Sequence, residues 1–379
     1  MTSLERMKQD NEKLILRVVH ENPGIYRKLV AKEANLASQT VTNLVTEMLD
    51  RKQIVESYNK ADGRGRVPIS LRLNYGEIYL LAVNLELDWV STYLHALDER
   101  IIAWDRVKVP ETGDVAQLLE ERITKVMKEA GERYRIQAVV ISVVGVVNED
   151  TGTVVFARHL RFYDYNLAER FAYLGVPVLV RNDANIIASY EKCVCKDDMN
   201  FMVAKLDHGI GSAFVLGTMN LKSTNNVAGE LGHVTVSSDE ERRCFCGKKN
   251  CLTQFISRGS LVEAYGKSYE ELVQDVKNQE PEAVEFVLKI CDYLVPTLAN
   301  MIGILDLDRV ILCGCTIDNF ASILYPRMEK MIRERLSCWS AFKGLKIHSG
   351  VNIVSISTKF WLDYFFSTES VRGLLWEEN

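Results

Sequence analysis

The segment GELGH at positions 229–233, ten further residues and then CFCGKKNC at positions 244–251 place one histidine and three cysteines in a short window. Zn²⁺ commonly binds four ligands of these kinds, and four protein ligands close the coordination shell as in structural sites. A glycine after the second cysteine allows the tight backbone turn that three converging sulfurs need. The segment therefore predicts a structural Zn²⁺ site formed by His233, Cys244, Cys246 and Cys251. The alternative is a set of buried, reduced thiols beside a histidine.

The composition of the whole chain is typical of a soluble globular protein. Its 379 residues suffice for two or three domains, and 47% of them are hydrophobic and 26% charged. The polar N-terminus is unlike a secretory signal, and no apolar run approaches the length of a bilayer span. Nine cysteines in such a chain indicate free thiols in a reducing compartment rather than a disulfide framework. We therefore expect a cytoplasmic protein with no membrane partner.

The charges are unevenly distributed along the chain. Residues 1–72 contain thirteen Lys and Arg against nine Asp and Glu, whereas the remainder is acidic and the net charge of the whole is −5. A basic segment attached to an acidic body favours a polyanionic partner for that segment. We interpret residues 1–73 as one domain and residues 74–379 as the body.

The N-terminal segment has the pattern of three helices and a hairpin. Helical spacing predicts helices near 4–21, 26–34 and 38–52, and strands follow near 54–58 and 67–73. The third helix has one apolar face, and short polar side chains at its start could reach base edges in a major groove. This order predicts a winged helix-turn-helix with DGRGR at 62–66 as the wing, whose alternative is a solvated turn. The predicted DNA contacts are Ser38, Gln39, Thr40, Thr42, Asn43, Arg64 and Arg66.

The body alternates strands and helices in two successive units. The sequence pattern predicts strands near 78–85, 91–97, 101–109, 136–147, 176–180, 200–205 and 212–216, with helices near 115–134 and from about 184. Repetition of such a unit is typical of an α/β body with two lobes.

Polar residues at a strand end mark a candidate ligand site in this body. Asn182 and Asp183 follow a predicted strand and open a helix, a position where ligands commonly bind in α/β proteins. Carboxylate, amide and imidazole groups can hydrogen-bond several sugar hydroxyls at once. The alternative for both residues is a helix N-cap.

These motifs together resemble the ROK family, which contains bacterial sugar repressors and sugar kinases. The resemblance rests on GELGH and CFCGKKNCL at 229–252, NDAN at 182–185, and TVT at 40–42 followed by GRGRVP at 63–68. It extends to about Gly314. It implies an α/β fold in which an N-terminal winged helix-turn-helix precedes a two-lobed, actin-like body of the sugar-kinase type, with a sugar in the cleft between the lobes.

The resemblance also implies residue roles. Asn182, Asp183, Glu230 and His233 match the family's sugar contacts, and in its kinases the matching aspartate is the catalytic base. His233 would bind Zn²⁺ with one ring nitrogen and a sugar hydroxyl with the other. The family's glutamate after Cys-Leu is Thr253 here. We expect from this difference another sugar preference, weaker binding or no effector.

Other departures argue against a sugar kinase. The family's first phosphate loop, Asp-x-Gly-Gly-Thr, is replaced by NLELD at 84–88, where no glycine remains and Glu86 would repel phosphate. The second loop is partly retained as DHGIGSA at 207–213, and the adenosine region reads CGCT at 313–316. Phosphoryl transfer depends on positioning and charge neutralisation, so these changes predict no enzymatic activity and no catalytic residues.

The sequence therefore predicts a DNA-binding transcriptional repressor of carbohydrate-utilisation genes, similar to the xylose repressors of the ROK family. A homodimer or homotetramer would bind double-stranded operator DNA. A sugar effector would change the distances that the DNA-binding domains of two subunits populate, and so the affinity for DNA. Two alternatives remain. One is an ATP-dependent sugar kinase with a DNA-binding head, and the other is a regulator controlled by a protein partner.

Overall fold

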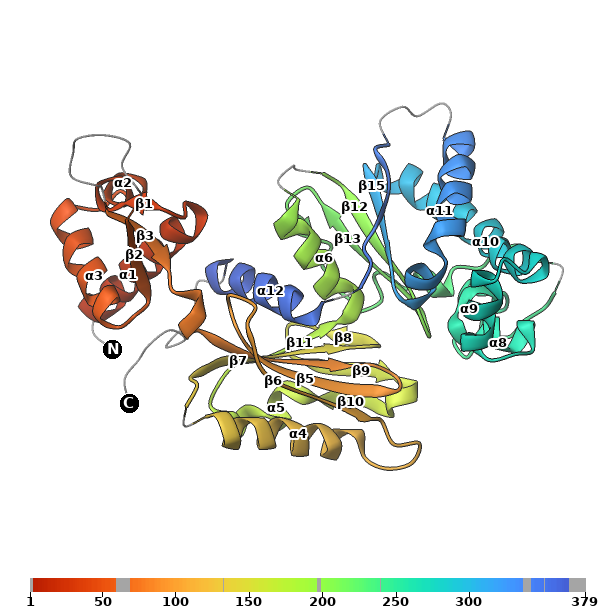
Figure 1. Ribbon diagram of the computed structural model, residues 1–379, viewed down its shortest axis with the longest axis horizontal. Helices are drawn as coiled ribbons and strands as arrows, with labels where there is room; N and C mark the ends of the chain where they lie inside the picture. Colours follow the sequence, from red (N-terminus) through yellow and green to blue (C-terminus); the bar gives the residue numbers. More distant parts are fainter. Residues whose placement is uncertain are drawn as a thin grey trace.

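The computed structural model describes residues 3–58, 69–131, 133–195, 199–238, 240–336, 342–350 and 352–367. An N-terminal head lies at one end of the molecule, followed by two α/β lobes (Figure 1). Helices α6 (Asp183–Val194) and α12 (Ile353–Ser367) lie between the sheets of the two lobes. This arrangement matches the predicted fold class of a winged helical head on a two-lobed body.

The head consists of three helices and a small antiparallel sheet. Its elements are α1 (Ser3–Glu21), β1 (Ile25–Tyr26), α2 (Arg27–Glu33), α3 (Ser38–Asp50), β2 (Ile54–Tyr58) and β3 (Ile69–Leu73). The strand order is β1-β3-β2, so the predicted hairpin gains a two-residue strand that the sequence pattern did not reveal. Ile15, Val45 and Met48 are fully buried where the apolar faces of the helices meet.

The first lobe is built on a five-stranded sheet of order β11-β7-β4-β5-β6. Its strands are β4 (Tyr79–Leu85), β5 (Trp89–Ala96), β6 (Ile101–Lys108), β7 (Ile136–Val143) and β11 (Val178–Asn182). Helix α4 (Val115–Ala130) covers one face, and the Asp114 side chain caps its start. A smaller sheet and a short helix adjoin this lobe: β8 (Val146–Asn148), β9 (Thr153–Ala157), β10 (Phe162–Asn166) and α5 (Leu167–Arg170).

The second lobe repeats the same pairing pattern, with strand order β14-β13-β12-β15-β16. Its strands are β12 (Phe201–Leu206), β13 (Ile210–Leu216), β14 (Met219–Asn220), β15 (Arg309–Cys313) and β16 (Gly344–Ile347). In both sheets the first three strands of the unit pair antiparallel, and the last two strands join in parallel. The helices of this lobe are α7 (Thr253–Ile256), α8 (Arg258–Tyr265), α9 (Tyr269–Lys277), α10 (Pro281–Leu305) and α11 (Cys315–Arg335).

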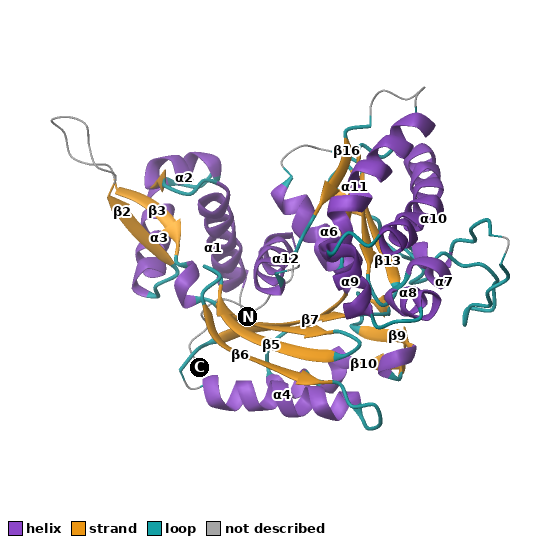
Figure 2. Ribbon diagram, turned by 45° about the vertical axis from the view of Figure 1, so that its right-hand side comes forward, coloured by secondary structure: helices purple, strands orange, loops and turns teal. Residues whose placement is uncertain are grey.

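Helix α12 joins the head to the body. It packs against α6 and β4, and it lies between α6 and helix α1 of the head (Figure 2). The ring of His20 stacks on Phe366 at a centroid distance of 4.9 Å, and the Arg17 guanidinium donates to the Phe366 carbonyl. The buried residues of the head and of α6 and α12 therefore form one continuous hydrophobic cluster.

Helix α10 is an exception to the expectation that no apolar stretch approaches the length of a bilayer span. Among the described residues it is the one helix whose length and composition would suffice to cross a membrane. Many core helices of soluble proteins have the same properties. In this fold α10 packs against α9 and α11, and residues such as Val287, Leu294 and Leu298 are fully buried.

Candidate interlobe ligand site and metal-binding group

The predicted metal ligands lie together in the second lobe. One donor atom from each of His233, Cys244, Cys246 and Cys251 lies within 4.8 Å of all the others. The Nδ1 atom of His233 is 3.4 Å from the Cys244 sulfur, and the Cys246 and Cys251 sulfurs are 3.5 Å apart. The set is one that could bind a metal ion.

Two glycines explain why the chain can form this group. Gly229 has a φ of +92°, and a side chain there would collide with the carbonyl oxygen of Ser212 in β13. The 3-10 turn Leu231–His233 therefore lies directly against the sheet. Gly247 has a φ of +89°, which allows the turn between Cys246 and Cys251.

The chemistry of the group favours a bound cation. Burial and the neighbouring thiols raise the pKa of Cys251 to about 12. A divalent metal supplies the positive charge that clustered thiolates need, and it would be bound by deprotonated sulfur. Phe245 of the same loop stacks on Phe156 of β9 at 6.0 Å, so the loop also contacts the first lobe.

The predicted sugar residues Asn182 and Asp183 lie at the start of α6. Asn182 is the N-cap: its Oδ1 accepts from the amides of Ala184 and Asn185, and its Nδ2 donates to the Gly145 carbonyl over 2.8 Å. The N-cap interpretation is therefore confirmed for Asn182. Asp183 is the first helical residue, and its side chain points to β12 of the second lobe, where Lys205 binds it.

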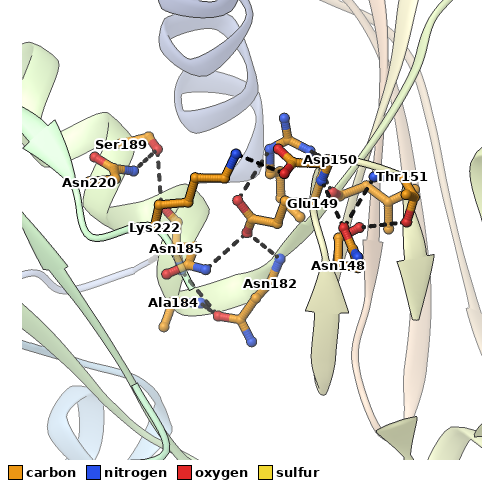
Figure 3. Close-up of polar contacts among 12 residues, drawn as sticks. Asn148, Glu149, Asp150, Thr151, Asn182, Ala184, Asn185, Ser189, Asn220 and Lys222 are labelled. Atoms are coloured by element: carbon orange, nitrogen blue, oxygen red, sulfur yellow. Dashed lines mark hydrogen bonds and ion pairs between the residues drawn. The ribbon is translucent and has the colours of Figure 1, made fainter. Parts of the chain in front are cut away.

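Glu149 is a polar neighbour of this helix start that sequence analysis missed. Its carboxylate accepts from the Asn182 amide over 3.2 Å and from the Asn185 side chain over 2.9 Å (Figure 3). Arg181 pairs with it at 3.5 Å. Asp150, the next residue of the same turn, forms an ion pair of 2.8 Å with Lys222 of the second lobe.

Glu230 lies between the metal-binding group and Asp183. Its Oε2 is 3.7 Å from Nε2 of His233, so the two ring nitrogens of the histidine face different groups. Burial and the nearby Asp183 carboxylate raise the pKa of Glu230. Thr253, which stands where the family has a glutamate, begins α7 and is buried with 8% of its surface exposed. The structure thus brings the four predicted sugar residues to one region between the lobes.

Lys205 on β12 is a second residue that sequence analysis missed. Its ammonium lies 2.5 Å from Asp183 and 3.6 Å from Asp207. The side chains of Lys205 and Asp183 are only 12% and 13% exposed. Burial alone would lower the pKa of Lys205, but the two carboxylates outweigh it and raise that pKa. A lysine in an apolar strand gives no sequence signal for such a pair.

The region that corresponds to the phosphate loops contains carboxylates and ion pairs. Asp88, in the turn after β4, lies 3.3 Å from His208 and 3.9 Å from Arg258 of the second lobe. Burial raises the pKa of Glu86, and the Asp207 carboxylate adds to this effect. Two acidic side chains of the first lobe therefore lie in the segment that corresponds to the first phosphate loop, whereas phosphate binding needs positive charge or backbone amides.

The segment that corresponds to the adenosine region, residues 313–316, lies at the end of β15 and the start of α11. The Cys315 thiol at the start of α11 contacts the Asp207 carboxylate at 3.2 Å. The guanidinium of Arg258 lies over the ring of Tyr269 at 4.8 Å and donates to Glu270. The buried hydroxyl oxygens of Tyr269 and Thr316 have no hydrogen-bond partner among the described residues, so the polar groups in this part of the lobe are only partly satisfied.

The predicted DNA contacts on α3 lie on its outer face. Ser38, Gln39, Thr42 and Asn43 are exposed, and Thr40 is half-buried. Gln39 donates to the Asn43 side chain over 2.9 Å, and the Thr42 hydroxyl donates to the Ser38 carbonyl. Arg64 and Arg66 lie outside the described residues.

A separate cavity of about 310 Å³ lies beside β16 and the start of α12. The carboxylate of the buried Glu191 borders it and contacts His348 and Lys346 at 2.5 and 2.6 Å. None of the predicted sugar residues lines this cavity.

The chain matches the model of one protein family, and it aligns with relatives over most of the length of both chains. The model of the ROK family matches residues 88–343. The xylose repressor of Caldicellulosiruptor bescii is 25% identical in an alignment of 373 positions that covers 90% of this chain and 91% of that protein. The crystal structure of a ROK family transcriptional regulator, a homologue of the Escherichia coli MLC protein, superposes with a TM-score of 0.77 at 23% identity, covering 96% of this chain and all of that one.

A sugar kinase shares the fold over a smaller part of the chain. A ROK family glucokinase from Streptomyces griseus, solved with glucose and AMPPNP, has a TM-score of 0.62 at 20% identity. It covers 75% of this chain and 98% of its own. At these identities the two structures establish the fold alone.

Proposed function

Because the chain belongs to the ROK family, we propose that it is a transcriptional repressor of carbohydrate-utilisation genes. Residues 1–73 would bind operator DNA, and residues 74–379 would bind a sugar effector between the lobes. The xylose repressor matched over 90% of this chain supports the proposal and makes xylose the first candidate effector. The protein would act in the cytoplasm, as a homodimer or homotetramer, without a membrane partner.

One observation supports this proposal most strongly. The end of the interlobe region around Asp183 and Glu230 differs from the end around Asp88 in how its polar groups are used. Polar groups suited to hydroxyls remain at Asp183 and Glu230. In the region that corresponds to the phosphate loops, Asp88 instead contacts His208 and forms an ion pair with Arg258 across the lobes. A kinase needs positive charge and amides around the phosphates it transfers. Carboxylates there oppose ATP binding, so we infer that the protein binds sugar without phosphorylating it.

The sugar would be held by Asn182, Asp183, Glu230 and His233. Asn182 already uses both lone pairs of its side-chain oxygen as an N-cap, so its contribution would be the remaining N–H of its amide group. His233 has Nδ1 toward the thiols and Nε2 toward Glu230. Zn²⁺ bound by His233 and the three cysteines would supply a structural cross-link and fix the orientation of this ring.

Operator binding would use the outer face of α3 and the wing. Gln39, Thr42 and Asn43 are exposed at the start of α3 and can donate to and accept from base edges. Arg64 and Arg66 would neutralise phosphates or enter the minor groove. Two heads of a symmetric dimer would bind two half-sites of a palindromic operator.

A packed route connects the proposed sugar site to the head. Helix α6 starts at Asp183 and packs along α12, whose Phe366 contacts His20 and Arg17 of α1. A sugar that binds one arrangement of the lobes more tightly would shift the population of head positions. We propose this as the way in which sugar changes operator affinity.

Two assays on the purified protein test the proposal. It should retain specific fragments of its own genome at physiological salt, and it should not consume ATP in the presence of xylose, glucose or N-acetylglucosamine. Sugar-dependent ATP turnover at the rate of about 1–100 s⁻¹ that is typical of kinases would reject the repressor-only function. Retention of no genomic fragment would reject the DNA-binding role.

A further inference from the structure

Stability alone does not account for the buried ion pair between Lys205 and Asp183, because buried ion pairs contribute little to the net free energy of folding. Taking both charges out of water costs about as much free energy as their attraction returns. Such a pair nevertheless fixes the position of its two side chains, since neither can move without leaving an uncompensated charge. The Lys205 ammonium lies 2.5 Å from the Asp183 carboxylate and both side chains are almost fully buried, so each fixes the position of the other.

Asp183 is surrounded by groups of both signs. Lys205 approaches from β12, Asp207 lies beyond Lys205 in the turn after β12, and Glu230 approaches from the loop before the 3-10 turn. The Cys313 thiol of β15 lies near both Lys205 and Asp183. Glu149 binds the two asparagines on either side of Asp183. Within the described residues, Lys205 is the cation whose ion pair with Asp183 the structure records.

One oxygen of Asp183 remains available for a ligand. Its Oδ2 is bound by the Lys205 ammonium at 2.5 Å, and its Oδ1 lies 3.0 Å from the amide of Ala184. A carboxylate oxygen has two lone pairs, so Oδ1 can accept a further hydrogen bond from a hydroxyl. A nearby ammonium also makes a carboxylate a weaker proton acceptor.

We propose that Lys205 is a positioning residue of the interlobe site, which fixes the Asp183 carboxylate as a permanent hydrogen-bond acceptor for a neutral sugar hydroxyl. This inference rests on the proposed sugar function. It gives a reason why Asp183 can retain its place in the site without serving as a base. The ligand it favours is an uncharged sugar, which donates a hydroxyl proton to Oδ1 without transferring it.

The first test compares Lys205→Met with the wild-type protein by calorimetry with xylose, glucose and N-acetylglucosamine. Methionine fills similar space but leaves the carboxylate without its cation. Wild-type affinity should change less than about twofold between pH 6.5 and 8.5, because Lys205 stays protonated. The variant should bind about tenfold more weakly at both pH values, because its carboxylate lacks the cation that fixes its position. Equal affinities of the variant and the wild type would overturn the proposal.

A matched control is Lys192→Met. Lys192 lies on α6, and it pairs with Asp363 of α12 at 2.9 Å with 23% and 38% of the two side chains exposed. Its loss removes one lysine ion pair from the same helix without changing the surroundings of Asp183. The sugar affinity and its pH profile should remain as in the wild type.

A second test needs no ligand. Thermal unfolding is measured for Lys205→Met, Asp183→Asn and the double variant. Asparagine removes the charge that Lys205→Met leaves uncompensated, so the double variant should be more stable than Lys205→Met alone. Additive losses would overturn the pairing on which the proposal depends. If the wild type binds no sugar, the proposed effector is wrong, and this unfolding cycle alone decides whether Lys205 fixes Asp183.

Discussion

The two ends of the interlobe region differ in how their polar side chains are used. Around Asp183, Glu230 and His233, oxygen and nitrogen atoms are held in place by Lys205 and by the metal-binding group. Around Asp88 and His208, polar side chains bind one another across the lobes. The comparison suggests how a kinase-like fold serves regulation: one end keeps groups that can bind hydroxyls, and the other end satisfies its own charges without a nucleotide.

The largest effect should follow loss of the metal-binding group. Cys246→Ser, or a strong chelator, should lower the free energy of unfolding by on the order of 3 kcal/mol and the melting temperature by roughly 5–10 °C, because metal binding is linked to folding. Metal content and thermal unfolding measure this. Cys193→Ser is the control, since Cys193 lies outside the group. An unchanged melting temperature after complete metal removal would contradict a structural role.

Substitution of a carboxylate at each of the two ends should show that only one end binds sugar. Asp183→Asn should weaken sugar binding roughly 10- to 100-fold, because a hydrogen bond to a charged group contributes about 1.5–3 kcal/mol. Asp88→Asn should change sugar affinity less than about threefold, since Asp88 pairs with His208 and Arg258 instead. Calorimetry with xylose measures both. Equal losses in the two variants would mean that the two ends do not differ in function.

Substitutions in the predicted wing of the head should weaken operator binding without changing sugar binding. Arg64→Ala with Arg66→Ala should weaken operator binding about tenfold and reduce the salt dependence by about two phosphate contacts. Sugar affinity and the melting temperature should stay as in the wild type. Fluorescence anisotropy at several salt concentrations measures the effect, and an unchanged salt slope would reject the wing as a phosphate contact.

The smallest effect concerns pH. Burial lowers the pKa of His208 below its ordinary value of 6.5, although Asp207 and Asp88 act in the opposite direction. The unfolded chain therefore binds this proton more tightly than the folded chain, so stability is lost as the pH falls below about 6.5. His208→Gln should reduce the difference in unfolding free energy between pH 7.5 and 5.5 by less than about 1 kcal/mol. The exposed His159 provides the control substitution, and an equal reduction in both variants would exclude His208 as the source.

Much of the fold could be predicted from local patterns. The apolar face of α3 and the cysteine spacing of 244–251 carried enough information to predict that helix and the metal-binding group, because both depend on neighbours close in sequence. The start of α3 after Ala37 was also correct, although Ala37 provides no side-chain cap.

Contacts between distant segments could not be predicted in this way. Lys205 meets Asp183 because β12 and α6 belong to adjacent layers of the second lobe, and no periodicity encodes that contact. The packing of Phe366 on His20 joins the last described helix to the first. Glu149 was missed for the same reason, since its partners lie more than thirty residues later in the chain.

The most direct test of the account is operator affinity with and without sugar, measured by fluorescence anisotropy on a genomic fragment that the protein itself selects. The account predicts that at least one of xylose, glucose and N-acetylglucosamine changes the affinity of the wild type by about tenfold, a coupling free energy of about 1.4 kcal/mol. It predicts no change in Asp183→Asn at the same sugar concentration. Identical operator affinity with every sugar, or the same change in Asp183→Asn, would contradict the claim that sugar bound between the lobes controls the head.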